Sequence, residues 1–279
     1  MHRKTKIWLI TASTLVLAGC ILFVGGMTMA GWDFAKLNTH QYETNTHTLQ
    51  DDFANITIQS KHADIHFVPS EECKVVCYEM QMVRHVVYVE ENTLIIETVD
   101  ERKWYDYIGI TVTTPKITVY LPTKAYNSLV IQGDTGDIKV CGASYDTIDL
   151  SVSTGNITLS EAVCTGDVTA RVSTGDATLE NVTCKNLFST GNTGNLLLKN
   201  VIASESFSIE RSTGDIKLEG CDAAELHVET NTGSVKGNLL SEKVFIVKTN
   251  TGKVSVPPTT SGGTCKITCN TGDVILHVE

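Results

Sequence analysis

The chain has few aromatic side chains and, after its first thirty residues, few basic ones. Phe, Trp and Tyr make up 6% of the 279 residues, so the core must consist of aliphatic stacks rather than a globular aromatic core. Of the 22 Lys and Arg residues, three precede residue 31, which leaves 19 basic against 32 acidic residues in 31–279 and a net charge of −13 there. This sign argues against nucleic acid as a partner, which needs basic patches, and against flat docking on anionic lipid.

Motifs for catalysis are also missing. The sequence contains no Gly-x-Ser-x-Gly, no His-Glu-x-x-His and no phosphate-binding loop. Some β-helices are polysaccharide lyases or hydrolases with Asp or Arg clustered on one face, but here Arg171 and Arg211 occupy different positions of different repeats. We therefore expect no catalytic residue, no cofactor and no enzyme activity, with a polysaccharide-active enzyme as the third alternative.

The most regular feature is a Thr-Gly dipeptide, usually followed by Asp or Asn, that recurs after residue 134. The copies that recur at a fixed period are Thr135-Gly136-Asp137, Thr154-Gly155-Asn156, Thr174-Gly175-Asp176, Thr193-Gly194-Asn195, Thr213-Gly214-Asp215, Thr232-Gly233-Ser234, Thr251-Gly252-Lys253 and Thr271-Gly272-Asp273. The glycines of successive copies in this set lie 19 or 20 residues apart. A fixed period near 20 indicates a solenoid, in which each repeat is one coil that cannot bury its apolar face alone.

Apolar residues alternate with polar ones on both sides of each turn, which is typical of strands with one buried face. The inward position before a turn, such as Val152, and the one after it, Ile157, are five residues apart. This odd offset would place them on opposite faces of one strand, so the chain must bend between them. Gly can adopt φ > 0 at the bend, and Asp or Asn can bond the local backbone. We predict an all-β chain, a β-solenoid, with irregular N-terminal coils in 49–128 and regular repeats in 129–279.

The end of the repeat array carries an insertion. Residues Pro257 to Gly263 are expected to lengthen the return loop of the final coil. That coil would leave an open strand edge at the end of the solenoid, blunted by His277 and Glu279. Its Cys265 and Cys269 fall on inward positions, where cysteines act as small buried hydrophobes. Disulfides between adjacent coils remain an alternative.

The N-terminus reads as a membrane anchor. Arg3, Lys4 and Lys6 precede a stretch without charge, residues 7–30, that as a helix at about 1.5 Å per residue is long enough to span a bilayer. The positive charges place residues 1–6 in the cytoplasm and the rest outside. Residues 31–48 are interpreted as a stalk. The alternative is a lipoprotein signal, because residues 17–20 resemble a lipobox in which Cys20 is lipidated after cleavage.

The Asp and Asn residues after the glycines form a row about 4.8 Å apart if the coils stack in register. Such a row could bind Ca²⁺, which takes six to eight oxygens. The Gly-Gly-x-Gly-x-Asp nonapeptide of calcium-binding β-rolls is absent, and alternation of Asp with Asn relieves charge repulsion. We therefore interpret the row as a structural ladder that caps the turns.

Three other groups are candidates for binding. His62, Asp64 and His66 alternate along a strand and could chelate a metal, although their flanking apolar residues favour an ordinary solvent face. The exposed-loop aromatics Trp104, Tyr105 and Tyr107 could contact a partner or plug the end of the solenoid. Arg211 stands at a nominally inward position, which predicts a local bend or a buried partner.

An N-terminal anchor, a Trp-Asp-Phe stalk, the segment Ile-Thr-Val-Tyr-Leu-Pro (117–122) and Thr-Gly-Asp/Asn coils together resemble the bacterial "putative adhesin" family of unknown-function β-solenoid proteins. The resemblance covers residues 45–279. It implies a single-pass bacterial envelope protein with an extracytoplasmic domain and brings no shared catalytic residue.

We expect a non-catalytic, membrane-tethered protein that attaches to an envelope polymer or a surface protein. The alternative is an accessory or sensory subunit that acts on a membrane-protein partner through residues 7–30. The oligomeric state and the hand of the solenoid stay open.

Overall fold

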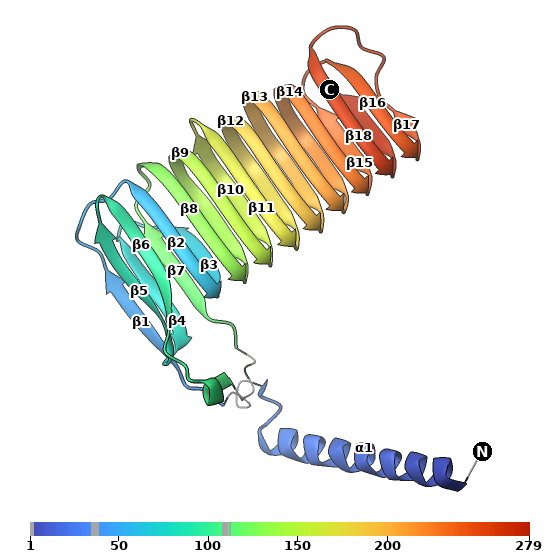
Figure 1. Ribbon diagram of the computed structural model, residues 1–279. Helices are drawn as coiled ribbons and strands as arrows, with labels where there is room; N and C mark the ends of the chain where they lie inside the picture. The colour runs from blue at the N-terminus through green and yellow to red at the C-terminus, as the bar shows by residue number, and fades with distance from the viewer. Residues whose placement is uncertain (1–2, 35–38, 108–110, 112) are drawn as a thin grey trace. The chain divides into compact units, whose positions relative to one another are not determined.

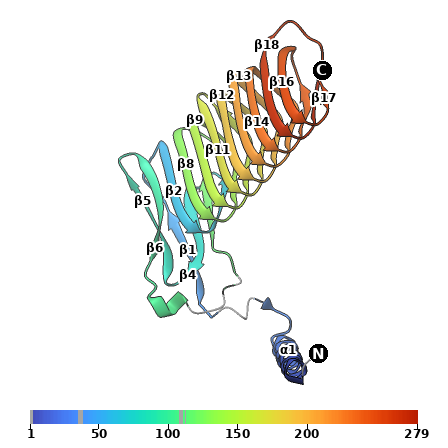
Figure 2. The ribbon, with the colours of Figure 1, turned by 45° about the vertical axis from the view of Figure 1, so that its right-hand side comes forward.

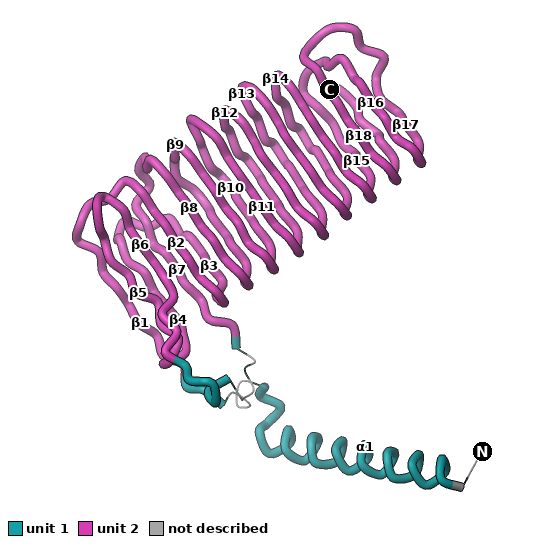
Figure 3. Tube along the Cα trace, viewed as in Figure 1, with its two compact units in different colours: residues 1–41, 102–113 teal, residues 42–101, 114–279 magenta. Residues whose placement is uncertain are grey.

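The computed structural model describes residues 3–34, 39–107, 111 and 113–279. The chain divides into two compact units, residues 1–41 with 102–113 and residues 42–101 with 114–279 (Figure 3). Residues 35–38 of the expected stalk lie outside the described residues.

The first unit contains the helix α1 (Arg3–Met29) and the short 3-10 helix η2 (Trp104–Tyr107). The segment Lys4–Met29 has a mean hydropathy of 2.4 and is not buried inside the unit, so it is long and apolar enough to cross a membrane. Thr11 and Thr14 donate their hydroxyl protons to the carbonyls of Ile7 and Ile10, one turn earlier. These bonds satisfy the polar atoms of an otherwise apolar helix.

The second unit is a column of stacked β-strands (Figures 1 and 2). Its first strands are β1 (Tyr42–Thr48), β2 (Asn55–His62), β3 (Asp64–Pro69), β4 (Lys74–Met80), β5 (Val83–Glu90), β6 (Thr93–Asp100), β7 (Lys116–Leu121), β8 (Ala125–Thr135) and β9 (Ile138–Thr154). The remaining strands are β10 (Ile157–Cys164), β11 (Asp167–Thr174), β12 (Ala177–Thr193), β13 (Leu196–Thr213), β14 (Ile216–Thr232), β15 (Val235–Leu239), β16 (Lys243–Thr251), β17 (Val254–Ser255), β18 (Gly263–Thr271) and β19 (Val274–Val278). The predicted β-solenoid is confirmed.

Each regular coil contributes one strand segment before its Thr-Gly turn and one after it. We call the sheet of segments that precede the turns the pre-turn wall and the sheet of segments that follow them the post-turn wall. Neighbouring coils pair in parallel and in register, so Ile138 lies beside Ile157, Ile157 beside Ala177 and Ala177 beside Leu196. These four side chains are at most 1% exposed, and the interior between the walls is such a set of aliphatic stacks.

Only glycine fits at the turns, because of both the backbone dihedral angle and the space between successive coils. Gly155 has φ = 139°, and a Cβ placed there would lie 2.1 Å from the carbonyl oxygen of Gly136 in the preceding coil. Each glycine therefore lets the next coil approach at the spacing of a β-sheet.

A second bend recurs in the post-turn wall, and sequence reasoning missed it. Glu161, Asn181 and Asn200 have φ between 52° and 54°, and Gly220 has φ = 60°. Asn181 donates to the Glu161 carboxylate and Asn200 donates to the side-chain Oδ1 of Asn181, both through Nδ2. The signal was present, because these residues also lie 19 or 20 positions apart.

The N-terminal part of the solenoid differs from the expectation of a stalk in 31–48 followed by irregular coils in 49–128. Residues 42–48, assigned to the stalk, form β1, which pairs antiparallel with β4. Strands β5 and β6 form a hairpin across Glu91 and Asn92, both with positive φ, as a two-residue turn requires. Strand β4 also runs antiparallel to β7, so the first coils leave the parallel pattern.

The order of the last two coils corrects the prediction that the C-terminal coil forms the open edge of the solenoid. Strand β18 pairs with β14 on one side and with β16 on the other, and β19 lies between β15 and β17. The C-terminal coil is thus inserted into the stack, and the segment before β18 is a crossover rather than a widened return loop. Strands β16 and β17 instead form the edge at this end of the stack, where Ile246 is 55% exposed.

Candidate functional site

The Asp and Asn side chains after the glycines form a continuous ladder of hydrogen bonds. In every coil a side-chain oxygen accepts the backbone N–H of the corresponding residue in the next coil. The bonds run from Asp137 to Asp64, Asn156 to Asp137, Asp176 to Asn156, Asn195 to Asp176, Asp215 to Asn195, Ser234 to Asp215, Asp273 to Ser234 and Lys253 to Asp273, over 2.7–3.4 Å. The order of these residues follows the spatial order of the coils.

Alternation of Asp and Asn adds a second contact at some steps. Asn156 donates Nδ2–H to Asp137 Oδ1 at 3.0 Å, and Asn195 donates in the same way to Asp176 at 3.3 Å. An Asn between two Asp residues separates their like charges, and its Nδ2–H bond occupies one carboxylate oxygen of the preceding Asp. The geometry is that of turn capping, the structural role that the sequence favoured over calcium binding.

The His62, Asp64 and His66 group has a structural explanation. His62 pairs with Thr135, and Asp64 Oδ1 accepts the N–H of Asp137, so His62-Ala63-Asp64 is the first turn of the ladder. Burial, followed by Lys116 and Lys139, lowers the pKa of His66. Within residues 3–34, 39–107, 111 and 113–279, the one group of three possible metal ligands lies elsewhere.

The outward side of the pre-turn wall is flat and polar, and we call it the polar face. At the second position before each turn glycine from Gly155 onward it presents a small hydroxyl or amide side chain: Ser153, Ser173, Asn192, Ser212, Asn231, Asn270 and Asn250. The last three form an amide ladder, in which Asn270 donates to Asn231 at 2.9 Å and Asn250 donates to Asn270 at 3.1 Å. Equivalent groups on adjacent coils thus repeat at the spacing of β-strands, about 4.8 Å.

Two shallow depressions lie on the polar face. The first, of about 230 Å³, is lined by residues of β12, β13, β14 and β18, including Thr190, Glu210, Glu229 and Thr268. The second, of about 380 Å³, is lined by residues of β2, β6, β8 and β9, including Gln132. Hydroxyl, amide and carboxylate groups converge on both depressions, which suits recognition of a ligand rich in hydroxyl groups.

Arg211 borders the first depression and is 4% exposed. Its guanidinium extends over Gly191, where a Cβ would lie 1.6 Å from Nη1, and donates from Nη2 to the hydroxyl of Ser189 at 3.0 Å. Nε is buried and has no hydrogen-bond partner among the described residues. Burial lowers the pKa of Arg211 to about 10, against the opposing effect of Asp176. The expected buried partner is therefore Ser189, a neutral one.

The aromatic residues of η2 belong to the first unit. Trp104, Tyr105 and Tyr107 are 77%, 49% and 60% exposed, and Trp104 packs edge to face on Tyr105. Arg102 lies over the ring of Tyr107 at 4.3 Å. Their contact with a partner stays a prediction. Cys20 lies exposed on α1, and its lipidation stays the alternative to an uncleaved anchor.

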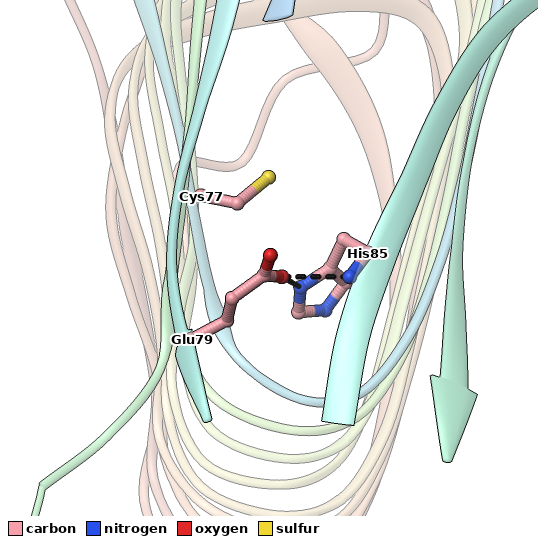
Figure 4. Close-up of side chains that lie close together, drawn as sticks. All are labelled: Cys77, Glu79 and His85. Atoms are coloured by element: carbon pink, nitrogen blue, oxygen red, sulfur yellow. Dashed lines mark hydrogen bonds and ion pairs between the residues drawn. The ribbon is translucent and has the colours of Figure 1, made fainter. Parts of the chain in front are cut away.

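Sequence reasoning did not predict a polar cluster that lies at the N-terminal end of the solenoid core. Cys77 and Glu79 on β4 and His85 on β5 are all buried, and their side chains face one another between the walls (Figure 4). Burial raises the pKa of Cys77 to about 12. Burial opposes ionisation of Glu79, but hydrogen bonds from His85 and Asn45 outweigh it and lower its pKa. A signal existed, because Glu79 continues the inward series of Val75 and Cys77.

All nine cysteines, which lie within the described residues, are free. Cys77, Cys221, Cys265 and Cys269 are at most 1% exposed, as expected of small hydrophobes in an aliphatic stack.

The fold agrees with solved structures. The chain is similar to the crystal structure of a "putative adhesin" from Bacteroides fragilis, with 17% identity, a TM-score of 0.54 and coverage of 85% of this chain and 97% of that one. A "putative adhesin" from Parabacteroides distasonis matches with 12% identity, a TM-score of 0.46 and coverage of 86% and 98%. A "putative lipid binding protein" from the same organism matches with 15% identity, a TM-score of 0.44 and coverage of 86% and 97%.

No curated protein matches the sequence. Two overlapping segments, residues 53–166 and 162–279, match the family described as Toastrack DUF4097. Together they include the first turn of the ladder, all the regular coils and the inserted C-terminal coil. The chain therefore belongs to the Toastrack DUF4097 family.

Proposed function

We propose that the chain is a non-catalytic, membrane-tethered binding protein of the bacterial envelope, and that its polar face binds an extended polymer rich in hydroxyl groups. The observation that carries the proposal is the pair of polar depressions on one wall, at β12–β14 with β18 and at β2 with β8. A ligand with a short repeat can contact successive coils in the same way, because the coils present equivalent groups at a fixed spacing.

The tether in this proposal is α1, an apolar helix of 27 residues with Lys4 and Lys6 at its start. An uncleaved helix would leave the β-solenoid outside the membrane. The name of one structural neighbour, the "putative adhesin" from Bacteroides fragilis, supports a surface role. The absence of a recognised catalytic motif agrees with binding rather than turnover.

Strand β12 supplies a matched pair of variants for the test. Thr190 lies in the first depression on the polar face, whereas Thr178 lies on the post-turn wall of the same strand, and both are half-buried. Thr190→Arg places a large cation in the depression, and Thr178→Arg adds the same side chain on the opposite wall.

The full-length protein in detergent would be sedimented with isolated bacterial cell walls, intact and stripped of anionic polymers. We expect saturable binding that Thr190→Arg weakens at least tenfold and Thr178→Arg leaves within twofold. Absence of binding, or equal loss in both variants, would refute the polar face as the site. Binding abolished by protease treatment of the walls would replace the polymer with a surface protein.

A further inference from the structure

The buried cluster at the N-terminal end of the solenoid has the composition of a metal site. We propose that Cys77, Glu79 and His85, completed by His47, bind a divalent cation of the zinc class that ties the two walls together. The site is independent of the polar face.

The topology brings the three groups together. Alternation along β4 points Cys77 and Glu79 to the interior of the post-turn wall. Met80 pairs with Val83 across a tight turn, so β5 returns on the other wall and presents His85 to the same interior. Figure 4 shows the Cys77 and Glu79 side chains on one wall and the His85 ring on the other.

The donor atoms are close enough for shared coordination. One ligand atom from each residue lies within 4.8 Å of the other two. In a tetrahedral zinc site with bonds of about 2.0–2.3 Å, ligand atoms are separated by about 3.3–3.8 Å. Small side-chain rotations therefore suffice. Thiolate, imidazole and carboxylate are the three donor types that zinc takes from proteins, whereas magnesium and calcium prefer oxygen alone.

Surrounding groups hold the ligands in place. His85 Nδ1 lies 2.7 Å from Glu79 Oε2, and its Nε2 lies 3.4 Å from the buried hydroxyl of Ser60. Asn45 donates from Nδ2 to Glu79 Oε1 at 2.8 Å. The Ser60 contact fixes the ring so that Nδ1 faces Glu79 and the thiol of Cys77. Glu79 Oε2 also accepts the backbone N–H of His85 at 2.6 Å, so both carboxylate oxygens are held in place, and a cation bound to Oε2 would replace only its contact with Nδ1.

His47 supplies an independent observation. The antiparallel register of β1 and β4 places Asn45 beside Cys77 and His47 beside Val75, so His47 faces the interior on the diagonal from Cys77. Its Nε2 is buried and makes no hydrogen bond with any described residue. A buried nitrogen without a partner is costly, and a cation reached by rotation of the ring would satisfy it. The cation would then join β1, β4 and β5.

Binding of the cation displaces protons from its ligands. The Cys77 thiol releases its proton to solvent, and the Nδ1–H of His85 or the carboxyl group of Glu79 releases any proton shared between them. The cation takes the place of these protons and sheds its water ligands. Strand β1, whose one strand partner within the described residues is β4, lies at the edge of the sheet, where the cation can enter.

Cobalt provides the test, because a tetrahedral Co²⁺–thiolate bond gives a charge-transfer absorption band. The full-length protein in detergent, first stripped with a chelator, would be titrated with Co²⁺ and then with Zn²⁺. We expect one equivalent of Co²⁺ per chain with the thiolate band, displaced by Zn²⁺. Cys77→Ser should lose the band. Cys265→Ser, which changes another fully buried cysteine far along the stack, should keep it.

A second variant guards against a folding defect in Cys77→Ser. His47→Gln removes a nitrogen without a partner, so the melting temperature of the metal-free protein should not change. Its dissociation constant for Zn²⁺ should rise by about tenfold or more. Wild-type protein should melt several degrees higher with Zn²⁺ than with chelator. No thiolate band in the wild type, a band that survives in Cys77→Ser, or equal zinc affinity in His47→Gln would each overturn the proposal.

Discussion

Replacement of one turn glycine tests whether close stacking of the coils holds the solenoid together. Gly175 has φ = 135°, and a Cβ there would lie 2.0 Å from the carbonyl oxygen of Gly155. An alanine in this backbone region costs about 1–3 kcal/mol, because the region is essentially restricted to glycine. The contacting atom belongs to backbone, so the two turns must also move apart.

That movement stretches hydrogen bonds on both sides of the turn. The N–H of Gly155 donates to Thr174 and that of Gly175 to Thr193, each at 2.9 Å. Weakening of both adds about 1 kcal/mol each. We therefore expect Gly175→Ala to lower the free energy of unfolding by about 3–5 kcal/mol. The measurement is the midpoint of urea unfolding followed by far-UV circular dichroism, with an unchanged slope against urea.

Gly133→Ala is the matched control. Gly133 has no positive φ, and the nearest atom to an added Cβ, Val152 Cγ2, would lie at an ordinary 3.6 Å. Loss of glycine flexibility in the unfolded chain should leave this variant unchanged or stabilise it by about 0.4–1 kcal/mol. If Gly175→Ala unfolds within about 0.5 kcal/mol of the wild type, the stacking argument is wrong, because surface substitutions without such a role fall in that range.

Two further predictions concern the ladder and the buried thiols. Asp176→Ala removes the acceptor for the N–H and Nδ2–H of Asn195. It should lower the free energy of unfolding by about 1–2 kcal/mol in the same urea assay. No change would mean that water replaces the carboxylate in these bonds. Burial raises the pKa of Cys184 and Cys265 to about 12 from 9.0, so the folded state holds protons that the unfolded state has lost between these values. Their stability contribution is complete below pH 9.0 and falls as pH rises toward 12, by up to about 1.4 kcal/mol per pH unit for each thiol. Cys184→Ala should therefore flatten the decline measured from pH 8 to about 10, and an unchanged slope would contradict the assignment.

The repeat made the coil architecture readable from the sequence. A glycine every 19 or 20 residues sets the length of a coil, and period-two alternation sets which side chains enter the core. The five-residue offset between Val152 and Ile157 required a bend at the turn, and both residues are buried as expected. These features are local, so no knowledge of distant contacts was needed.

The order of the final coils could not be read in this way. Strand β18 follows β16 in the chain but stands between β14 and β16 in the stack. All three carry the same alternation and end in the same Thr-Gly turn, so each can pair in register with either of the others. Sequence pattern specifies register within such a stack but leaves the choice of neighbour degenerate, and the crossover before β18 decides it.

The candidate sites also differ in whether the sequence alone predicts them. The sequence by itself determined the Asp/Asn ladder, because its members lie at the repeat period and equivalent positions of parallel coils must become neighbours. Only the tertiary structure brought Cys77 and Glu79 to His85 and showed that His62-Ala63-Asp64 is the first turn of the ladder. The first coils contain antiparallel strands outside the period, so their neighbours depend on how the chain crosses between the walls, which no local pattern encodes.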